Sequence, residues 1–207
     1  MTTQRNDDVR KRAQRVLQGA NVLIEGHFDF GNGYHGRTYL NPHMLFCQPS
    51  TIWQLAQDLL DVLPYEITTQ VQAVVGPATG GALLAHTLAG LLDGRRSLEH
   101  PPCMFAPLDY DVEERLRLRS TYRAVLAGKK VLIADDVRNT GKTLSHGAEL
   151  VRKAGGDVIA TTQIYDRMAS IVTLDVPNVP LLEFDARDIY ISTTCPQCAA
   201  GAPLTSF

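Results

Sequence analysis

The sequence predicts an α/β protein built on one mainly parallel sheet with helices on its faces. From residue 50 to about residue 185, short apolar runs alternate with segments of helical periodicity, which is typical of a parallel sheet buried on both sides. Two of the apolar runs end in polar, glycine-containing turns, the places where open α/β sheets bind ligands. With 207 residues, 44% of them hydrophobic, the chain can bury one substantial core.

The first fifty residues differ in character from the rest. Residues 26–43 are rich in glycine, histidine and aromatic residues and lack helical periodicity, so they indicate short strands and loops. Gly31, Gly33 and Gly36 match a dinucleotide fingerprint, but Pro42 follows too soon for the helix that such a site needs. We expect an N-terminal helix and hood segment over 1–50, an α/β core over 51–190 and a C-terminal tail over 191–207, together one compact domain.

Each core element is expected from its own pattern. Apolar residues recur at helical spacing from Ile52 to Leu63, and Thr51 with Gln54 forms a plausible capping box. A second helix is expected over 81–92, and a third begins near Leu144 and ends at Gly155 and Gly156. Strands are expected over 71–75, 103–106, 131–134, 158–165 and, as the candidate for a fifth, 181–184.

The most informative stretch is VLIADDVRNTGKTL, residues 131–144. Its apolar run ends in Asp135 and Asp136, whose carboxylates suit sugar hydroxyls. The following turn offers backbone N–H groups and two hydroxyls at a helix N-terminus, which suits a phosphate monoester. Lys142 makes the turn look like a P-loop, but the earlier glycine of that motif would fall at Asp136, which excludes a Walker A loop.

Two further segments carry related chemistry. Residues 74–81, VVGPATGG, form a second strand-to-helix junction whose glycines let backbone N–H groups approach an anion, although such turns are often only structural. Residues 109–123 hold four acidic residues followed by four arginines. This segment is either a solvated hairpin with neutralising charges or a clamp for a diphosphate.

Residues 131–144 resemble the PRPP-binding signature of the type I phosphoribosyltransferases, a buried strand, an acidic pair and a T-T-G-x-T loop. Asn139 replaces the first loop threonine, and Arg138 replaces an apolar residue. The resemblance implies the type I phosphoribosyltransferase fold, with a five-stranded, mainly parallel sheet and a small N-terminal hood. It also implies Mg²⁺-dependent transfer of phosphoribose from PRPP to a nucleobase nitrogen, with release of pyrophosphate and no protein nucleophile.

The resemblance assigns roles to matching residues. Asp135 and Asp136 would bind the ribose hydroxyls and, through water, Mg²⁺. The 5′-phosphate would lie on Asn139, Thr140, Gly141, Lys142 and Thr143, and pyrophosphate on Ala78, Thr79, Gly80 and Gly81. A mobile loop carrying Arg115, Arg117 and Arg119 would close over the site and complete the catalytic set. Orotate enzymes use lysines in that loop, and this chain has no lysine between Lys11 and Lys129. Arginine stabilises charge but cannot serve as a general base.

The base is expected to be orotate, which would place the enzyme in pyrimidine nucleotide biosynthesis. Phe28, Phe30, Asn32, Gly33 and Tyr39 resemble the hood pattern of orotate phosphoribosyltransferases, although Gly31 replaces a lysine common there. Arg167 resembles the arginine that meets the orotate carboxylate, and an ordinary turn with an exposed arginine is the alternative. A purine or xanthine substrate, a non-catalytic PRPP-binding regulator and an unrelated sugar-phosphate module remain alternatives.

Composition limits the other partners and the location. Twenty basic against 22 acidic residues give no electrostatic footprint for nucleic acid or a membrane surface. No apolar stretch reaches a membrane span and the N-terminus has no signal-like apolar region, so we expect a cytoplasmic protein. The resemblance implies a homodimer.

The spacing of the cysteine and histidine residues predicts no further metal site. Four cysteines do not make a disulfide scaffold, and Cys195 with Cys198 supplies only two of the four ligands of a structural zinc. The tail around them resembles the ending of some orotate phosphoribosyltransferases. His27, His35 and His43 are spaced by eight residues, which fits no common ligand helix or hairpin, so they are expected to be surface or hydrogen-bonded histidines.

Overall fold

The computed structural model describes residues 2–19, 22–30, 33–96, 100–167, 172–183 and 189–206. Its core is a six-stranded sheet with the order β5-β4-β3-β6-β7-β8. All neighbouring pairs are parallel except β5, which pairs antiparallel with β4. The strands are β3 (Ala73–Pro77), β4 (Met104–Tyr110), β5 (Leu116–Arg117), β6 (Lys130–Arg138), β7 (Asp157–Asp166) and β8 (Asn178–Glu183).

The five predicted strands therefore form a parallel sheet, and the structure adds one antiparallel edge strand. The addition, β5, is only two residues long and lies in the arginine-rich segment, so no strand pattern marks it in the sequence. Phe184, at the end of the expected fifth strand, lies outside the described residues.

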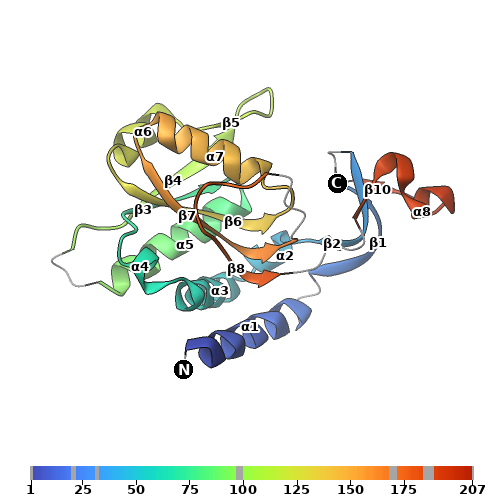
Figure 1. Cartoon of the computed structure of the whole chain (residues 1–207), viewed down its shortest axis with the longest axis horizontal. Coiled ribbons are helices and arrows are strands. Elements are labelled where there is room, and N and C mark those ends of the chain that lie inside the picture. The colour runs from blue at the N-terminus through green and yellow to red at the C-terminus, as the bar shows by residue number, and fades with distance from the viewer. Residues whose placement is uncertain are drawn as a thin grey trace.

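Helices cover both faces of this sheet, as Figure 1 shows. On β6, Leu132 and Ala134 join the core under α3 and α5, whereas Val131 and Ile133 join the core under α6 and α7; all four are fully buried. This confirms a strand buried on both faces. The helices are α1 (Thr2–Gly19), α2 (His43–Phe46), α3 (Pro49–Val62), α4 (Tyr65–Thr68), α5 (Gly80–Gly94), α6 (Ser120–Leu126) and α7 (Lys142–Lys153).

Two helix boundaries illustrate how local sequence acts. The predicted capping box is wrong, because α3 begins earlier, with Pro49 in its first turn, and the Thr51 hydroxyl instead donates to Oε1 of Gln48 at 3.2 Å. The end of α7 is as predicted: Gly155 adopts a φ of +82°, the left-handed conformation that stops a helix at low cost for glycine.

A second sheet, called the hood sheet, has four strands in the order β10-β1-β2-β9. The hairpin of β1 (Leu23–Asp29) and β2 (Tyr34–Leu40) comes from the N-terminal segment, whereas β9 (Ile189–Ile191) and β10 (Thr205–Ser206) come from the tail. Between β9 and β10 lie the 3-10 turn η1 (Ser192–Thr194) and the short helix α8 (Pro196–Ala199). The two ends of the chain thus meet in one sheet; Gly31 and Asn32 of the hood pattern lie outside the described residues.

Topology identifies where a ligand can bind. Strand β3 has β4 on one side and β6 on the other, so the winding of the sheet reverses between β3 and β6. Open α/β sheets bind ligands outside the carboxyl ends of the strands at such a switch point. In Figure 1 the core strands point toward the hood sheet, which stands beyond that edge. Among the described helices, none has both the length and the apolar character that a membrane crossing requires.

Candidate functional site

The acidic pair lies at the carboxyl end of β6, beside the switch point. The strand continues past Ala134 and pairs with β7 as far as Arg138, so it is longer than predicted. Asp135 is 6% exposed and Asp136 is half-buried. The Asp136 N–H donates to Oδ1 of Asp135 at 2.9 Å, and the Val137 N–H donates to Oδ1 of Asp136 at 2.8 Å. Burial and the adjacent Asp136 raise the pKa of Asp135 well above its ordinary value.

Within the described residues, this pair has no ion-pair partner of opposite charge. Among the described residues, no third carboxylate, histidine or cysteine joins the pair as a potential metal ligand. Such a pair fits Mg²⁺, which keeps much of its water shell and binds through substrate phosphates.

The glycine loop after β3 touches the acidic pair. A Cβ atom on Gly80 would lie 2.0 Å from Oδ2 of Asp136, and one on Gly81 would lie 2.7 Å from Oδ1 of Asp135. Only glycine lets the start of α5 come this close. The Ala78–Thr79 peptide bond in this loop is cis, and the Ala78 N–H donates to the Leu108 carbonyl at 2.7 Å. The two junctions singled out in the sequence therefore form one site.

The turn from Asn139 to Thr143 leads from β6 into the twelve-residue helix α7. Gly141 has a φ of +83°, and a Cβ there would lie 2.5 Å from the Val172 carbonyl oxygen. The Val172 N–H donates to the Thr140 carbonyl at 3.1 Å, so the segment at 172 supports the turn. The exposed side chains of Lys142 and Thr143 stand at the N-terminus of α7, where an anion is favoured.

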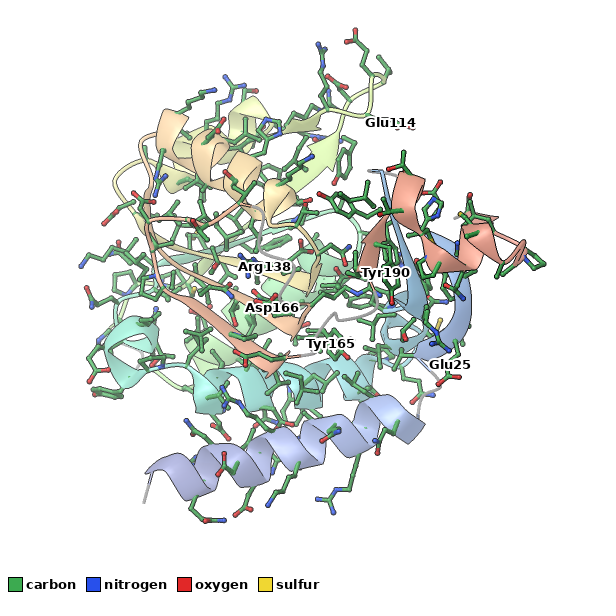
Figure 2. All side chains as sticks on the ribbon, turned by 45° about the vertical axis from the view of Figure 1, so that its right-hand side comes forward. Glu25, Glu114, Arg138, Tyr165, Asp166 and Tyr190 are labelled. Atoms are coloured by element: carbon green, nitrogen blue, oxygen red, sulfur yellow. The ribbon has the colours of Figure 1, made fainter. Side chains whose placement is uncertain are left out.

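A buried ion pair between the last residues of β6 and β7 supports this turn. Nη1 of Arg138 donates to Oδ2 of Asp166 at 2.8 Å, and both side chains are at least 90% buried. The same oxygen accepts from the side-chain amides of Gln163 at 3.0 Å and Asn178 at 2.9 Å. Figure 2 labels Arg138 and Asp166 next to each other, at the paired ends of β6 and β7. The residue that departs from the family pattern, Arg138, thus has a structural partner that the sequence did not indicate.

A cavity of about 340 Å³ lies between the acidic pair and the hood sheet. Arg167 is 5% exposed, and its guanidinium lies 4.3 Å from the centre of the Phe30 ring. It donates to Oδ1 of Asn139 at 3.2 Å and to the Thr38 carbonyl. Burial lowers the pKa of Arg167 from its usual high value. The alternative of an exposed arginine is therefore wrong. The cavity is lined by Asp29, Phe30, Tyr39, Leu40, Pro42, His43, Asp136, Val137, Asn139, Arg167 and Ser206.

The predicted hood residues take different places. Phe30 and Tyr39 line the cavity, whereas Phe28 is buried and packs against Tyr39, with ring centres 5.5 Å apart. The sequence did not indicate Asp29 or Ser206 as lining residues. Ser206 reaches the cavity because β10 pairs with β1, a contact between the two ends of the chain that no local pattern announces.

The arginine-rich segment is a hairpin that neutralises its own charges. Asp109 accepts hydrogen bonds from Nε of Arg117, at 2.9 Å, and from Nε of Arg119, and these bonds lower its pKa. Arg115 donates to Asp111 at 3.0 Å. Figure 2 labels Glu114 at the tip of the hairpin, and this tip projects away from the core. In this conformation the three arginines do not contact the acidic pair, and the clamp stays a prediction.

The base of the hairpin nevertheless lies near the site. Burial and the negative charges of Asp135 and Asp136 raise the pKa of Tyr110, the last residue of β4. The hairpin therefore starts within electrostatic range of the acidic pair and extends outward from it.

Comparison with known proteins adds independent findings. Residues 52–186, more than half of the chain, match the family model described as the phosphoribosyl transferase domain. An orotate phosphoribosyltransferase of Carboxydothermus hydrogenoformans is 31% identical over 183 residues, which cover 88% of this chain and 89% of the relative.

Solved structures share the fold at lower identity. The crystal structure of orotate phosphoribosyltransferase from Aeropyrum pernix has a TM-score of 0.62 at 21% identity, covering 83% of this chain and 93% of that one. Adenine phosphoribosyltransferase from Thermoanaerobacter pseudethanolicus also has a TM-score of 0.62, at 18% identity, covering 84% of this chain and 99% of that one. Enzymes named for different bases thus resemble the chain equally in fold, so the choice of base depends on the residues that line the cavity.

Proposed function

The chain belongs to the phosphoribosyltransferase family, and on that premise we propose that it transfers 5-phosphoribose from PRPP to a ring nitrogen of orotate. In this reaction the bond between the ribose C1 and a pyrophosphate oxygen breaks, and the bond between C1 and the base nitrogen forms. Pyrophosphate leaves with the electron pair, the proton that the ring nitrogen loses passes to the departing pyrophosphate or to water, and the product is the 5′-nucleotide of the base. The N-terminal helix and hood segment (1–50), the core (51–190) and the tail (191–207) all contribute to the proposed site.

One observation carries this proposal: the glycine loop and the acidic pair are in direct contact at the switch point of the sheet. Two anion-binding junctions thus flank one pair of carboxylates, as a ribose with a phosphate at one end and a diphosphate at the other requires. Asp135 and Asp136 would bind the ribose hydroxyls, residues 139–143 the 5′-phosphate, and residues 78–81 the pyrophosphate. Mg²⁺, when bound beside Asp135 and Asp136, supplies positive charge to the diphosphate.

The choice of orotate is supported by the buried arginine in the cavity. A guanidinium has more N–H donors than the two that Arg167 gives to Asn139 and Thr38, so it can still bind a carboxylate. Phe30 and Tyr39 offer flat surfaces for a pyrimidine ring. A neutral purine would leave the buried charge of Arg167 without an anionic partner, which is unfavourable.

The arginine hairpin is proposed to close over the site during turnover. Arg115, Arg117 and Arg119 would exchange their aspartate partners for the pyrophosphate oxygens, which carry more charge as C1 becomes electron-poor. They would act by charge stabilisation and not as bases.

Location and assembly complete the proposal. All four cysteines are free thiols, which is consistent with the reducing cytoplasm. A homodimer is supported by Met44, Trp53 and Leu83, large apolar side chains about half exposed on the adjoining helices α2, α3 and α5. Light scattering after size exclusion would give the mass of two chains, and a single-chain mass would refute the dimer.

The experiment that tests the function measures pyrophosphate release from Mg²⁺ and PRPP with orotate, uracil, adenine, hypoxanthine and xanthine. The proposal predicts release with orotate and at most slow release with the others. Turnover of a purine instead would move the chain to another base, and tight PRPP binding without turnover of any base would favour a regulator.

A further inference from the structure

Four potential metal ligands meet between the hood hairpin and the tail, although they are far apart in the sequence. His27 lies on β1, His35 lies on β2, and Cys195 and Cys198 flank the start of α8 in the tail. Their ligand atoms all lie within 4.8 Å of one another, and His27, His35 and Cys195 are buried. The proposed phosphoribosyl transfer uses none of these residues.

The prediction from spacing, that these histidines share no ligand site, is wrong for two of them. In the hairpin, Phe28 pairs with Gly36 and Asp29 with His35, so an eight-residue spacing brings His27 and His35 side by side. They are 4% and 6% exposed, whereas His43 is exposed and lies elsewhere. His27 is hydrogen-bonded, as expected, and it is not a surface residue.

The distances within the cluster are those of a tetrahedral site. Nε2 of His27 is 3.4 Å from Nδ1 of His35 and 3.4 Å from Sγ of Cys195. Sγ of Cys198 is 3.6 Å from Nε2 of His27 and 3.2 Å from Nδ1 of His35. Zinc–nitrogen bonds of about 2.0–2.1 Å and zinc–sulfur bonds of about 2.3 Å in a tetrahedron require separations of about 3.3 Å between two nitrogens, about 3.6 Å between nitrogen and sulfur, and about 3.8 Å between two sulfurs, so these four separations lie within about 0.4 Å of the tetrahedral values. A zinc ion therefore fits between these four atoms with little movement.

The surroundings orient the ligands. Nδ1 of His27 is 3.0 Å from the Ala202 carbonyl oxygen, so this nitrogen carries the proton and the lone pair of Nε2 faces the cluster. Zinc binds the thiolate form of cysteine and the neutral form of histidine.

We propose that His27, His35, Cys195 and Cys198 bind a structural zinc ion that joins the tail to the hood hairpin. Two sulfur and two nitrogen ligands in a tetrahedral arrangement select zinc, and four protein ligands leave no open position for catalysis. The ion would hold β10 against β1, where only Thr205 and Ser206 pair, and so keep Ser206 in the wall of the cavity. Because the hood strands are short, a metal crosslink supplies stability that their small core does not.

The first test is metal analysis of the full chain purified without chelators. We expect about one zinc per chain in the wild type and less than about a tenth of that in Cys195→Ser and His27→Ala. The matched control Cys47→Ser removes an exposed cysteine outside the cluster and should keep the wild-type zinc content. Substoichiometric zinc in the wild type, or zinc retained in both cluster variants, would overturn the proposal.

A second test does not depend on the variants folding. Wild-type protein stripped of metal is titrated with Co²⁺, and its visible spectrum and free thiols are measured. The proposal predicts the intense absorption of tetrahedral, thiolate-bound cobalt, and displacement of cobalt by zinc. The weak spectrum of octahedral cobalt would refute the site. A disulfide between Cys195 and Cys198 in protein freshly purified under reducing conditions, seen as the loss of two free thiols, would also refute it. None of these readouts depends on phosphoribosyl transfer, so they separate this proposal from the function proposed above.

Discussion

Among single residues, Asp135 combines the strongest physical constraint with a central proposed role. Its carboxyl is buried beside Asp136, and both burial and that neighbour raise its pKa. The charged form of Asp135 is therefore unfavourable in the ligand-free protein. A ligand that brings positive charge and hydroxyl donors relieves this cost. Burial that destabilises the empty site therefore becomes a source of affinity for Mg²⁺ and a sugar.

The first prediction concerns Asp135→Asn. A raised pKa in the folded state contributes stability that is present below the unfolded pKa of about 3.9 and is lost as the pH rises through the folded pKa. The asparagine side chain cannot ionise, so the variant does not lose this stability as the pH rises. The ligand-free variant should therefore have a melting temperature about 2–4 °C or more above that of the wild type at pH 8. The difference should shrink at pH 4, and PRPP turnover should be lost.

Calorimetry at both pH values measures this effect, because other titrating groups are common to the two proteins. Equal melting temperatures at pH 8 would mean that the ionised carboxylate is tolerated without a ligand.

The second prediction concerns Arg167. A hydrogen bond to a charged group contributes about 1.5–3 kcal/mol, so Arg167→Lys, which keeps the charge and loses the planar fork, should raise the KM for orotate about 10- to 100-fold. The KM for PRPP should change little. Steady-state kinetics with each substrate varied in turn would detect the split.

Arg37→Ala is the matched control for Arg167, since Arg37 is an exposed arginine on β2, the strand whose Thr38 carbonyl accepts from Arg167. It should leave both KM values unchanged. Equal rises in both KM values for Arg167→Lys would indicate a disturbed fold and would argue against a base contact.

At the scale of elements, the start of α5 and the end of β6 act as one unit because two glycines let them touch. The contact has no room for a methyl group. Elsewhere on the same helix, nothing lies within 4 Å of a Cβ built on Gly90. The helix therefore contains its own control for the effect of a glycine-to-alanine change.

The third prediction uses that contrast. Gly80→Ala should lower PRPP turnover at least about 100-fold, because its methyl group displaces the Asp136 carboxylate. Gly90→Ala should keep activity and stabilise the protein by about 0.5–1 kcal/mol, since alanine is the better helix former. Denaturant unfolding and turnover assays on both variants test this, and an active Gly80→Ala enzyme would separate the loop from catalysis.

The hairpin of β4 and β5 is the element whose role depends on movement. The arginine side chains of its ion pairs are half exposed or more. Such exposed pairs contribute little to the free energy of unfolding. The fourth prediction is that Arg119→Ala lowers kcat at least about tenfold while the free energy of unfolding changes by less than about 1 kcal/mol.

Arg152→Ala is the control for the hairpin variant, because Arg152 forms a comparably exposed pair with Asp175 elsewhere on the surface. It should change neither kcat nor stability. An unchanged kcat in Arg119→Ala would mean that the hairpin is a solvated loop without a role in turnover.

For the whole molecule, the core and the presence of a small N-terminal hood could be predicted from sequence, but the pairing of the hood strands with the tail could not. Buried runs such as 131–134 and glycine stops such as Gly155 are local signals, and they lie where expected. The hood sheet joins Phe28 to Thr205 through strands of two to seven residues, so its pairing depends on contacts between distant segments. The same long-range pairing brings His27, His35 and the two tail cysteines together, although these residues are far apart in the sequence.

The same division applies to the site. The acidic pair, the glycine loop and Arg167 were each visible as a motif, because ligand-binding turns have local requirements for glycine and charge. The partners of Arg138 and the place of Ser206 were not visible, because they follow from how β6 lies beside β7 and β10 beside β1. Most proposed chemical groups can thus be found in the sequence, whereas their support depends on the fold.

The most direct test of the central claim follows PRPP by phosphorus NMR in one reaction with Mg²⁺, orotate and the full-length protein. The account predicts that the PRPP diphosphate signals are replaced by pyrophosphate and that a new phosphate monoester signal appears, only when orotate is present. Asp136→Asn under the same conditions should leave PRPP intact. Unchanged PRPP signals with the wild-type protein, or equal conversion by Asp136→Asn, would contradict the account.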